Sequence, residues 1–212
     1  MSVSTLRLTL SRPLHLLRQR LFAMRDWKKR RYAAPSPGFI KTQVLLRNGI
    51  ADATWIETGT YFGDTTDFLS RHARQVYSIE PAPALFERAV RRFRKVPNVR
   101  VLPGTSEEQL PQLLPTLSGD VNFWLDGHYS AGVTYQGSVD TPIVAELAYI
   151  EGQMARYRNV VVLIDDVRCF DPTVPQFAHY PNLDFLVDWA RRNRLQWHIE
   201  HDIFVARKIH AP

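Results

Sequence analysis

Three aspartates follow directly after two apolar segments in the second half of the chain. Asp126 follows the run that ends at Leu125, and Asp165 and Asp166 follow the run that ends at Ile164. If the two runs are neighbouring strands of a parallel sheet, their carboxylates converge at one edge and repel one another unless a cation neutralises them. Oxygen ligands without cysteine favour Mg²⁺, Mn²⁺ or Ca²⁺ over structural zinc. We therefore predict a divalent metal, Mg²⁺ in the first place, on Asp126, Asp165 and Asp166, the alternative being that these acids only cap loops and helix ends.

Proton transfer is the second chemistry that this region offers. Asp126 is followed closely by His128 and Tyr129, and we predict all three as catalytic residues. A histidine titrates near neutrality and suits the role of a base that takes a hydroxyl proton, while a tyrosine would need a nearby metal to lower its pKa. The choice between His128 and Tyr129 stays open, because a single histidine can also be a metal ligand or a structural residue. The following segment, 129–141, is rich in hydroxyl groups and suits a sugar or another polyol.

A glycine-containing segment near residue 60 could hold a nucleoside cofactor. Gly59 and Gly63 allow a sharp turn and a close approach of the backbone to a ligand, and the helix that follows directs its free N–H groups toward the same edge. Glu80 ends the next apolar run about twenty residues later, where a carboxylate can accept both hydroxyls of a ribose. The sequence has no G-x-G-x-x-G motif and no P-loop motif, which argues against NAD and against a P-loop NTPase.

These residues must be positioned by an alternation of strands and helices, which predicts a parallel sheet covered by helices on both faces. A final pair of strands around His201-Asp202 is expected to be antiparallel. The expected strands are 54–57, 76–80, 99–102, 121–126, 160–165, 195–200 and 203–209, and the expected helices are 64–73, a helix through Leu85 to Phe93, 107–117, 142–156 and 183–193.

Five short motifs in this order resemble class I S-adenosylmethionine (SAM)-dependent methyltransferases. They are Glu57-Thr-Gly-Thr-Tyr-Phe-Gly63, Ile79-Glu80, Gly104-Thr-Ser-Glu107, Leu125-Asp126 and Ile164-Asp-Asp-Val167. The pattern is similar to the metal-dependent branch typified by catechol O-methyltransferase, and to macrocin O-methyltransferases and cephalosporin-hydroxylase-like proteins. The resemblance implies a Rossmann-like, doubly wound α/β fold with a mostly parallel seven-stranded sheet and an antiparallel final strand.

The resemblance also assigns roles to single residues. It implies that the turn after the first strand contacts the methionine part of SAM, that Glu80 contacts the ribose, and that the segment around Ser106 contacts the adenine. Catechol O-methyltransferase has a lysine three residues after its first aspartate, where this chain has Tyr129, which leaves the base in doubt. The predicted cofactor-binding residues are Glu57, Thr58, Gly59, Thr60, Gly63, Asp64, Thr65, Glu80, Thr105, Ser106 and Glu107.

Taken together, these features predict a SAM-dependent O-methyltransferase that acts on a hydroxyl of a polar small molecule or glycan with help from a divalent metal. One alternative keeps the fold and changes the reaction, as in the cephalosporin-hydroxylase-like proteins. Another is a nucleic-acid-binding protein or RNA methyltransferase that uses a basic N-terminal arm, although the rest of the chain lacks a basic stripe with interleaved aromatic residues. A fold without catalytic activity is a further possibility. Arg168, beside the acids, either binds an acidic acceptor or forms a surface salt bridge.

The basic charge is concentrated at the N-terminus. Residues 1–50 hold eleven Lys or Arg and one acid, whereas residues 51–212 hold sixteen basic and twenty acidic residues. We therefore predict two parts, a basic helical arm with a linker (1–50) and the methyltransferase domain (51–212). The arm carries leucines at helical spacing, and we expect its helix to begin at Pro13 with Ser11 as N-cap and a linker at residues 35–38. It either packs on its own domain or a twin, giving a homodimer, or binds an anionic membrane surface.

The composition also bears on where in the cell the protein is expected. The chain is 45% hydrophobic and 23% charged, as in soluble globular proteins, and its single cysteine, Cys169, excludes an internal disulfide. With no apolar run long enough for a membrane span and no signal-peptide pattern, we expect a cytoplasmic protein, peripheral to the inner face of a membrane if the arm binds lipid.

Overall fold

A computed structural model describes residues 4–127 and 141–208 of the chain, with side chains from residue 17 onward. Its centre is a seven-stranded sheet in the order β3-β2-β1-β4-β5-β7-β6, in which β7 runs antiparallel to both β5 and β6 and the other pairs are parallel. This confirms the predicted Rossmann-like fold with a mostly parallel sheet. The strands are β1 (Thr54–Thr58), β2 (Gln75–Glu80), β3 (Val99–Pro103), β4 (Gly119–Leu125), β5 (Tyr157–Ile164), β6 (Gln196–Glu200) and β7 (Ile203–Lys208).

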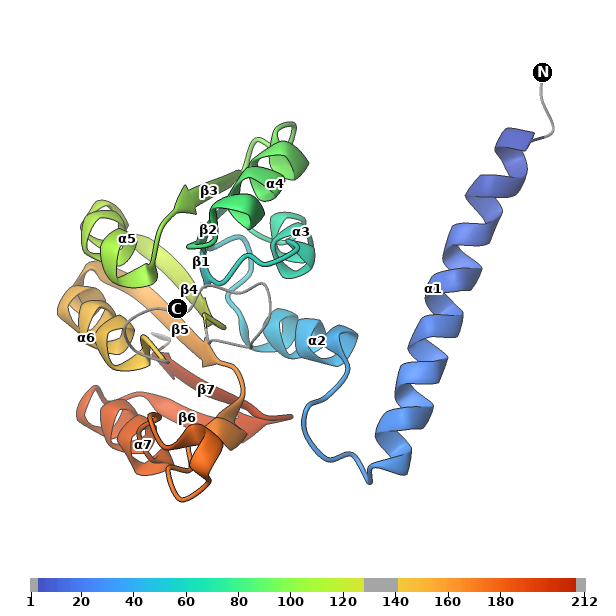
Figure 1. The fold of residues 1–212 in the computed structure, drawn as a ribbon. Coiled ribbons are helices and arrows are strands. Elements are labelled where there is room, and N and C mark those ends of the chain that lie inside the picture. Colours follow the sequence, from blue (N-terminus) through green and yellow to red (C-terminus); the bar gives the residue numbers. More distant parts are fainter. Residues whose placement is uncertain (1–3, 128–140, 209–212) are drawn as a thin grey trace.

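Helices cover both faces of the sheet, so the body has three layers (Figure 1). Buried side chains of α5, α6 and α7 pack on one face, and those of α2 and α3 pack on the other. The helices are α1 (Ser4–Lys29), α2 (Gly38–Asn48), α3 (Asp64–Ser70), α4 (Pro83–Phe93), α5 (Ser106–Leu113), α6 (Ile143–Gln153) and α7 (Leu183–Arg192).

The central strands form because apolar and β-branched residues predominate in them. Every residue of β1 is buried, and β4 and β5 each end in five buried residues. Because alternate side chains point to opposite faces, Phe123 packs into the core cluster under α5, α6 and α7, while Trp124 packs into the cluster under α2 and α3. Burial on both faces is the pattern expected of a parallel sheet covered by two helix layers.

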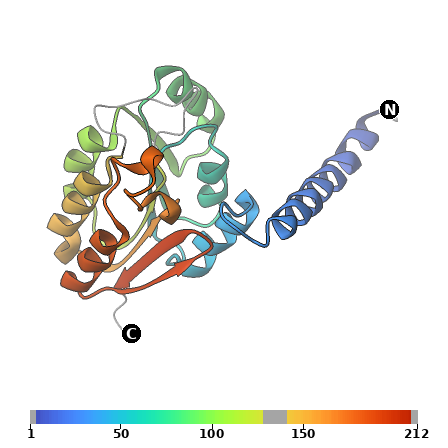
Figure 2. The same ribbon diagram turned by 60° about the horizontal axis from the view of Figure 1, so that its bottom comes forward.

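The N-terminal helix is longer than the sequence predicts. Helix α1 begins at Ser4 and continues through Pro13, so the expected start at Pro13 and the N-cap at Ser11 are wrong. A proline removes one backbone hydrogen bond and often kinks a helix, but it does not have to end it. The helix projects away from the sheet in both views (Figures 1 and 2). Its C-terminal end is fixed by Trp27, which is buried, donates a hydrogen bond to the carbonyl of Ala33 at 2.9 Å, and packs edge-on against His201.

Helix α2 is absent from the sequence prediction, which placed a linker at residues 35–38 and no helix after it. Pro37 is its N-cap residue, and Val44 and Leu45 are fully buried against the sheet. The predicted boundary at residue 50 stays a prediction, but residues on its N-terminal side contribute to the core. Among the described residues, no helix is long and apolar enough to span a membrane.

Candidate functional site

The predicted site residues meet at the carboxyl edge of the parallel strands. Residue pairing aligns Thr58 at the end of β1 with Ile79 of β2 and with Leu125 of β4, and Leu125 pairs in turn with Ile164 at the end of β5. The residues that follow these positions therefore leave the sheet side by side. In open α/β sheets this edge is where ligands bind.

The turn after β1 depends on Gly59. Its φ is +88°, a conformation that side chains disfavour, and its N–H donates to the carbonyl of Ile79 at 3.0 Å. A Cβ at this position would lie 2.8 Å from the carbonyl oxygen of Asp126, so the turn packs directly against the end of β4. Gly63, with φ +81°, is the N-cap of α3. Both glycines thus have a structural reason that matches their predicted place in a cofactor-binding turn.

Glu57 is fully buried beneath this turn. Its Oε2 accepts hydrogen bonds from Thr66 Oγ1 at 2.5 Å and from Ser78 Oγ at 2.6 Å. Its Oε1 is buried without a hydrogen-bond partner among the described residues. Burial raises the pKa of Glu57 from its ordinary 4.5 to about 7, because loss of hydration outweighs the two hydroxyl hydrogen bonds. A buried carboxylate oxygen without a partner is what a cationic or N–H-bearing ligand group would satisfy.

Glu80 lies at the end of β2, on the other side of the turn. Its Oε2 accepts from the backbone N–H of Tyr61 at 2.7 Å and its Oε1 from that of Ala82 at 2.9 Å. Burial raises the pKa of Glu80 even though these backbone hydrogen bonds oppose the shift. A carboxylate has about four lone-pair positions, so two backbone bonds fix its orientation and leave acceptor capacity for a ligand.

The remaining predicted cofactor residues differ in their surroundings. Thr60 Oγ1 lies 2.6 Å from Ser78 Oγ and helps to hold the turn. Asp64 follows the N-cap Gly63 instead of capping α3 itself, and its exposed carboxylate pairs with Arg92 at 2.8 Å. Thr105 caps α5 in a reciprocal hydrogen-bonding arrangement with Glu108. Thr58 and Ser106 are buried, and Thr65 and Glu107 are partly buried.

The three predicted metal-ligand aspartates are brought together at the ends of β4 and β5. Asp165 is 1% exposed, and Asp126 and Asp166 are partly buried. Burial, followed by the charge of Asp165, raises the pKa of Asp126 well above its ordinary value, and burial likewise raises the pKa of Asp165. Such shifts are expected where several carboxylates share a site and not all of them can be ionised at once.

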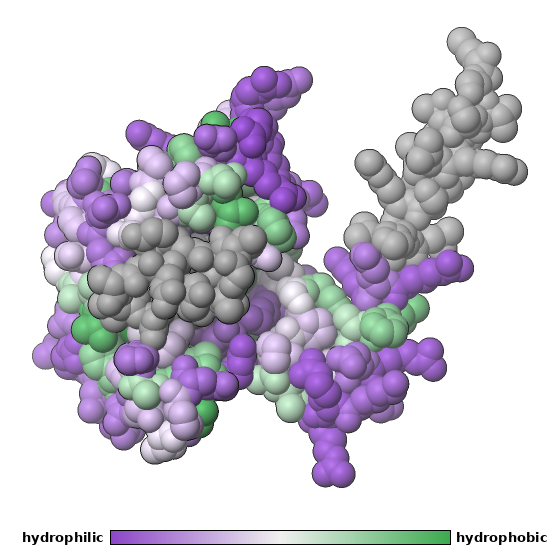
Figure 3. Space-filling model, in the orientation of Figure 1, coloured by the Kyte–Doolittle hydropathy of each residue, from purple (hydrophilic) through white to green (hydrophobic). Residues whose placement is uncertain are grey.

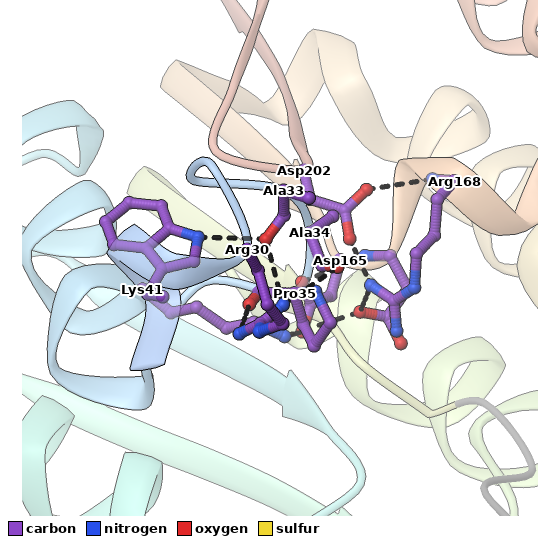
Figure 4. A network of polar contacts seen from close by, with 10 residues as sticks. Arg30, Ala33, Ala34, Pro35, Lys41, Asp165, Arg168 and Asp202 are labelled. Carbon is purple, nitrogen blue, oxygen red and sulfur yellow. Dashed lines mark hydrogen bonds and ion pairs between the residues drawn. The ribbon is translucent and has the colours of Figure 1, made fainter. Parts of the chain in front are cut away.

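A residue that the sequence analysis missed supplies positive charge to this cluster. Lys41 of α2 extends its ammonium to Asp165 Oδ2, with which it forms a hydrogen-bonded ion pair, and to Asp166 Oδ1 at 3.3 Å (Figure 4). Burial lowers the pKa of Lys41, but the charges of Asp165, Asp166 and Asp126 raise it above its ordinary value. No signal local to the cluster marks Lys41, because it lies 124 residues before its partner Asp165 in the sequence.

The same geometry tests whether the cluster fits a divalent metal. Among residues 4–127 and 141–208, no three histidine, cysteine, aspartate or glutamate side chains form a group that could hold an ion. The oxygens of Asp165 and Asp166 are directed at the Lys41 ammonium, so this arrangement does not fit the predicted metal. The metal prediction is therefore not confirmed.

Arg168 extends this charge network away from the sheet edge. Its guanidinium donates to Asp166 Oδ1 at 2.7 Å and forms an ion pair with Asp202 (Figure 4). The pKa of Arg168 is raised, since these two carboxylates outweigh the effect of burial. Of the two roles considered for Arg168, the structure favours a salt bridge over binding of an acidic acceptor.

Glu146 of α6 is a second residue that the sequence analysis missed. It is 1% exposed, and burial raises its pKa to about 7. Its Oε1 is buried without a hydrogen-bond partner among the described residues, and a Cβ on Gly127 would lie 3.7 Å from that oxygen and 3.1 Å from Thr58 Oγ1. Glu146 therefore lies beside the backbone that follows Asp126. The predicted bases His128 and Tyr129, and most of the polar segment after them, lie outside the described residues.

Comparison with known proteins supports the fold at low sequence identity. No protein-family model and no curated protein match the sequence. The N-methyltransferase NodS from Bradyrhizobium japonicum WM9 has a similar structure, with a TM-score of 0.52, 15% identity, and coverage of 79% of this chain and 92% of that chain. Its complex with S-adenosyl-l-homocysteine gives a TM-score of 0.50 at 15% identity, covering 79% and 84%. The 23S rRNA methyltransferase ErmE gives 0.50 at 13% identity, covering 81% and 67%. At these identities the likeness concerns the fold, and this chain has the Rossmann-like fold of class I methyltransferases.

Proposed function

We propose that this protein is a SAM-dependent methyltransferase that methylates a hydroxyl group of a polar small molecule or glycan. The observation that carries the proposal is the pair of buried glutamates on either side of the Gly59 turn. Glu57 has a carboxylate oxygen without a partner in the described part of the chain, and Glu80 is oriented by two backbone N–H groups while keeping acceptor capacity. Two such acceptors at the carboxyl edge of adjacent strands suit a ligand with a cationic end and a ribose.

The chain's own residues would hold SAM at three points. Glu57 would accept from the ammonium of the methionine part, Glu80 from the ribose hydroxyls, and the N-terminus of α5 around Ser106 would lie along the adenine. Gly59 is required because any side chain there would meet the Asp126 backbone. SAM supplies an electrophilic methyl group when it is bound, so the protein's main task is to align the acceptor oxygen with it.

The acceptor would approach from the ends of β4 and β5. Asp126 follows β4 with its backbone beside the Gly59 turn, and its carboxylate is near enough to Asp165 and Lys41 for their charges to shift its pKa. Transfer to a hydroxyl requires loss of its proton, for which Asp126, His128 and Tyr129 are the candidate acceptors. A divalent metal is not part of this proposal, because the Lys41 ammonium occupies the position between the carboxylates.

An RNA acceptor is a second candidate, favoured by one specific observation. The described part of α1 and the segment after it expose a row of basic side chains, and hydrophilic residues dominate this part of the surface (Figure 3). Basic surfaces bind phosphate backbones, and such binding weakens steeply as salt concentration rises. A filter-binding titration with ribosomal RNA at two salt concentrations would support this candidate if binding is tight and lost on removal of residues 1–34.

The proposed function is tested by isothermal titration of the protein with SAM. We expect binding to the wild-type chain and a loss of about tenfold to 100-fold in affinity for Glu80→Ala, since each hydrogen bond to a charged group contributes about 1.5–3 kcal/mol. Glu87→Ala is the matched control, because Glu87 is an exposed acid on α4 that pairs only loosely with Arg91, at 3.4 Å. Absence of SAM binding in the wild-type protein, or equal affinities for all three proteins, would contradict the proposal.

A further inference from the structure

The position of Lys41 is built into the fold of α2. Lys41 shares one face of the helix with Val44, Leu45 and Asn48, which follow it at intervals of three, four and seven residues, and these three are buried. Val44 and Leu45 pack in the cluster that includes Trp55 and Trp124 of the sheet. A lysine on the buried face of a helix is costly unless its charge is paired. The helix therefore holds this ammonium against the sheet edge, where the aspartates supply the compensation.

Three of the aspartate oxygens that would bind a metal are already engaged. Asp165 Oδ2 pairs with Lys41, and Asp165 Oδ1 accepts from the backbone N–H of Asp166 at 2.9 Å. Asp166 Oδ1 is shared between Lys41 at 3.3 Å and Arg168 at 2.7 Å. Mg²⁺ binds its oxygen ligands at about 2.1 Å in octahedral geometry. A metal at this position would have to displace the ammonium and break both of its ion pairs.

We propose that Lys41 is the resident cation of the acceptor site, and that it takes the place of a divalent metal by pairing with Asp165 and Asp166, beside Asp126. The name acceptor site rests on the proposed methyltransferase function. The position of the Lys41 ammonium against the aspartates rests only on the geometry. The repulsion among the three acids, which made a cation necessary, is relieved by a side chain of the same polypeptide.

The proposal is tested by titrating Mn²⁺ into the metal-free protein and following free Mn²⁺ by electron paramagnetic resonance. We expect the wild-type chain to show no saturable Mn²⁺ binding. Lys41→Met, which removes the charge and keeps much of the aliphatic stem, should gain saturable Mn²⁺ binding at least about tenfold tighter than any residual, non-saturating binding to the wild type, because the carboxylates are then left without their cation. The double variant Lys41→Met/Asp165→Asn should lose that gain.

Controls separate this result from misfolding and from failure of the proposed function. Arg47→Met removes a basic residue from the same helix, one that pairs with Glu200 instead of the aspartates, and should leave Mn²⁺ binding absent. Circular dichroism reports whether each variant is folded, and the Mn²⁺ measurement needs no SAM. The proposal would be overturned if the wild type binds Mn²⁺ saturably and Asp165→Asn abolishes that binding. This comparison of the wild type with Asp165→Asn can overturn the proposal even if Lys41→Met does not fold. A folded Lys41→Met variant that gains no Mn²⁺ binding would overturn it as well.

Discussion

Glu57→Gln should change how the stability of the ligand-free protein depends on pH. The pKa of Glu57 is raised from its ordinary 4.5 to about 7 in the folded chain, so the folded state binds this proton more tightly than the unfolded state. Stability contributed by the neutral carboxyl is then fully present below pH 4.5 and is lost as the pH rises toward 7. One unit of pKa shift corresponds to about 1.4 kcal/mol. Ionisation of Glu57 between pH 5 and pH 8 should therefore lower the free energy of unfolding by about 2.5 kcal/mol.

Glutamine has nearly the same shape and does not ionise, so it removes this dependence. Its carbonyl oxygen can still accept from Thr66 and Ser78, as Glu57 Oε2 does. Urea unfolding followed by circular dichroism at pH 5 and at pH 8 gives the two free energies of unfolding for each protein. The loss between the two pH values should be smaller in Glu57→Gln by about 2.5 kcal/mol. Glu87→Gln, on the exposed face of α4, should match the wild type.

The same variant also tests the role of Glu57 in binding. If the carboxylate pairs with the ammonium of SAM, binding favours its ionised form, so wild-type affinity should rise with pH up to about 7 and then level off. Glu57→Gln should bind SAM more weakly and without this rise. An unchanged slope of stability with pH in Glu57→Gln would refute the reasoning, because it would mean that Glu57 does not titrate near pH 7 in the folded chain.

Three further variants test other parts of the molecule. Gly59→Ala should lower SAM affinity and the melting temperature together, since its Cβ would lie 2.8 Å from the Asp126 carbonyl at a φ that costs about 1–2 kcal/mol; unchanged values of both would contradict the predicted role of the turn. Deletion of residues 1–34 should abolish binding to anionic liposomes in a flotation assay and spare SAM binding, and liposome binding that survives the deletion would rule out the arm as the lipid anchor. With an acceptor in hand, His128→Ala should lower turnover by roughly 10²–10⁴-fold, whereas Tyr129→Phe should not; a near-native rate in the histidine variant would exclude it as the base.

Much of the fold could be predicted because its signals are local. The strands that form the centre of the sheet are short apolar runs such as 160–164. Each run is followed by a residue at which the strand ends. The final antiparallel pair was predicted from His201-Asp202, and both residues have positive φ, as a tight turn requires. The same locality explains the correct placement of Glu57 and Glu80 beside one turn, because adjacent parallel strands align their ends.

The errors arise where a local signal has two outcomes. Pro13 can start a helix or be accommodated inside one, and the structure has the second outcome. Proline and glycine at residues 35–38 do connect two helices, but Pro37 is also the N-cap of α2, which was not predicted. The periodicity of Val44 and Leu45 after this point is the signal that could have revealed the helix. Missing α2 also meant missing Lys41, because a lysine outside any predicted helix or strand gives no reason to expect a buried ion pair.

The acceptor site shows what sequence can and cannot decide about charge. That the three aspartates need a cation follows from their convergence alone, whereas the identity of the cation depends on a contact across 124 residues. The difference has chemical consequences. A metal with open coordination positions can bind two neighbouring oxygens of an acceptor at once, as in a catechol, and thereby selects vicinal diols. An ammonium carries one charge and three N–H donors, and Lys41 directs its ammonium at Asp165 and Asp166. If the proposed function holds, a site with Lys41 in this position would not require a chelating pair, and a single hydroxyl on the acceptor would be enough.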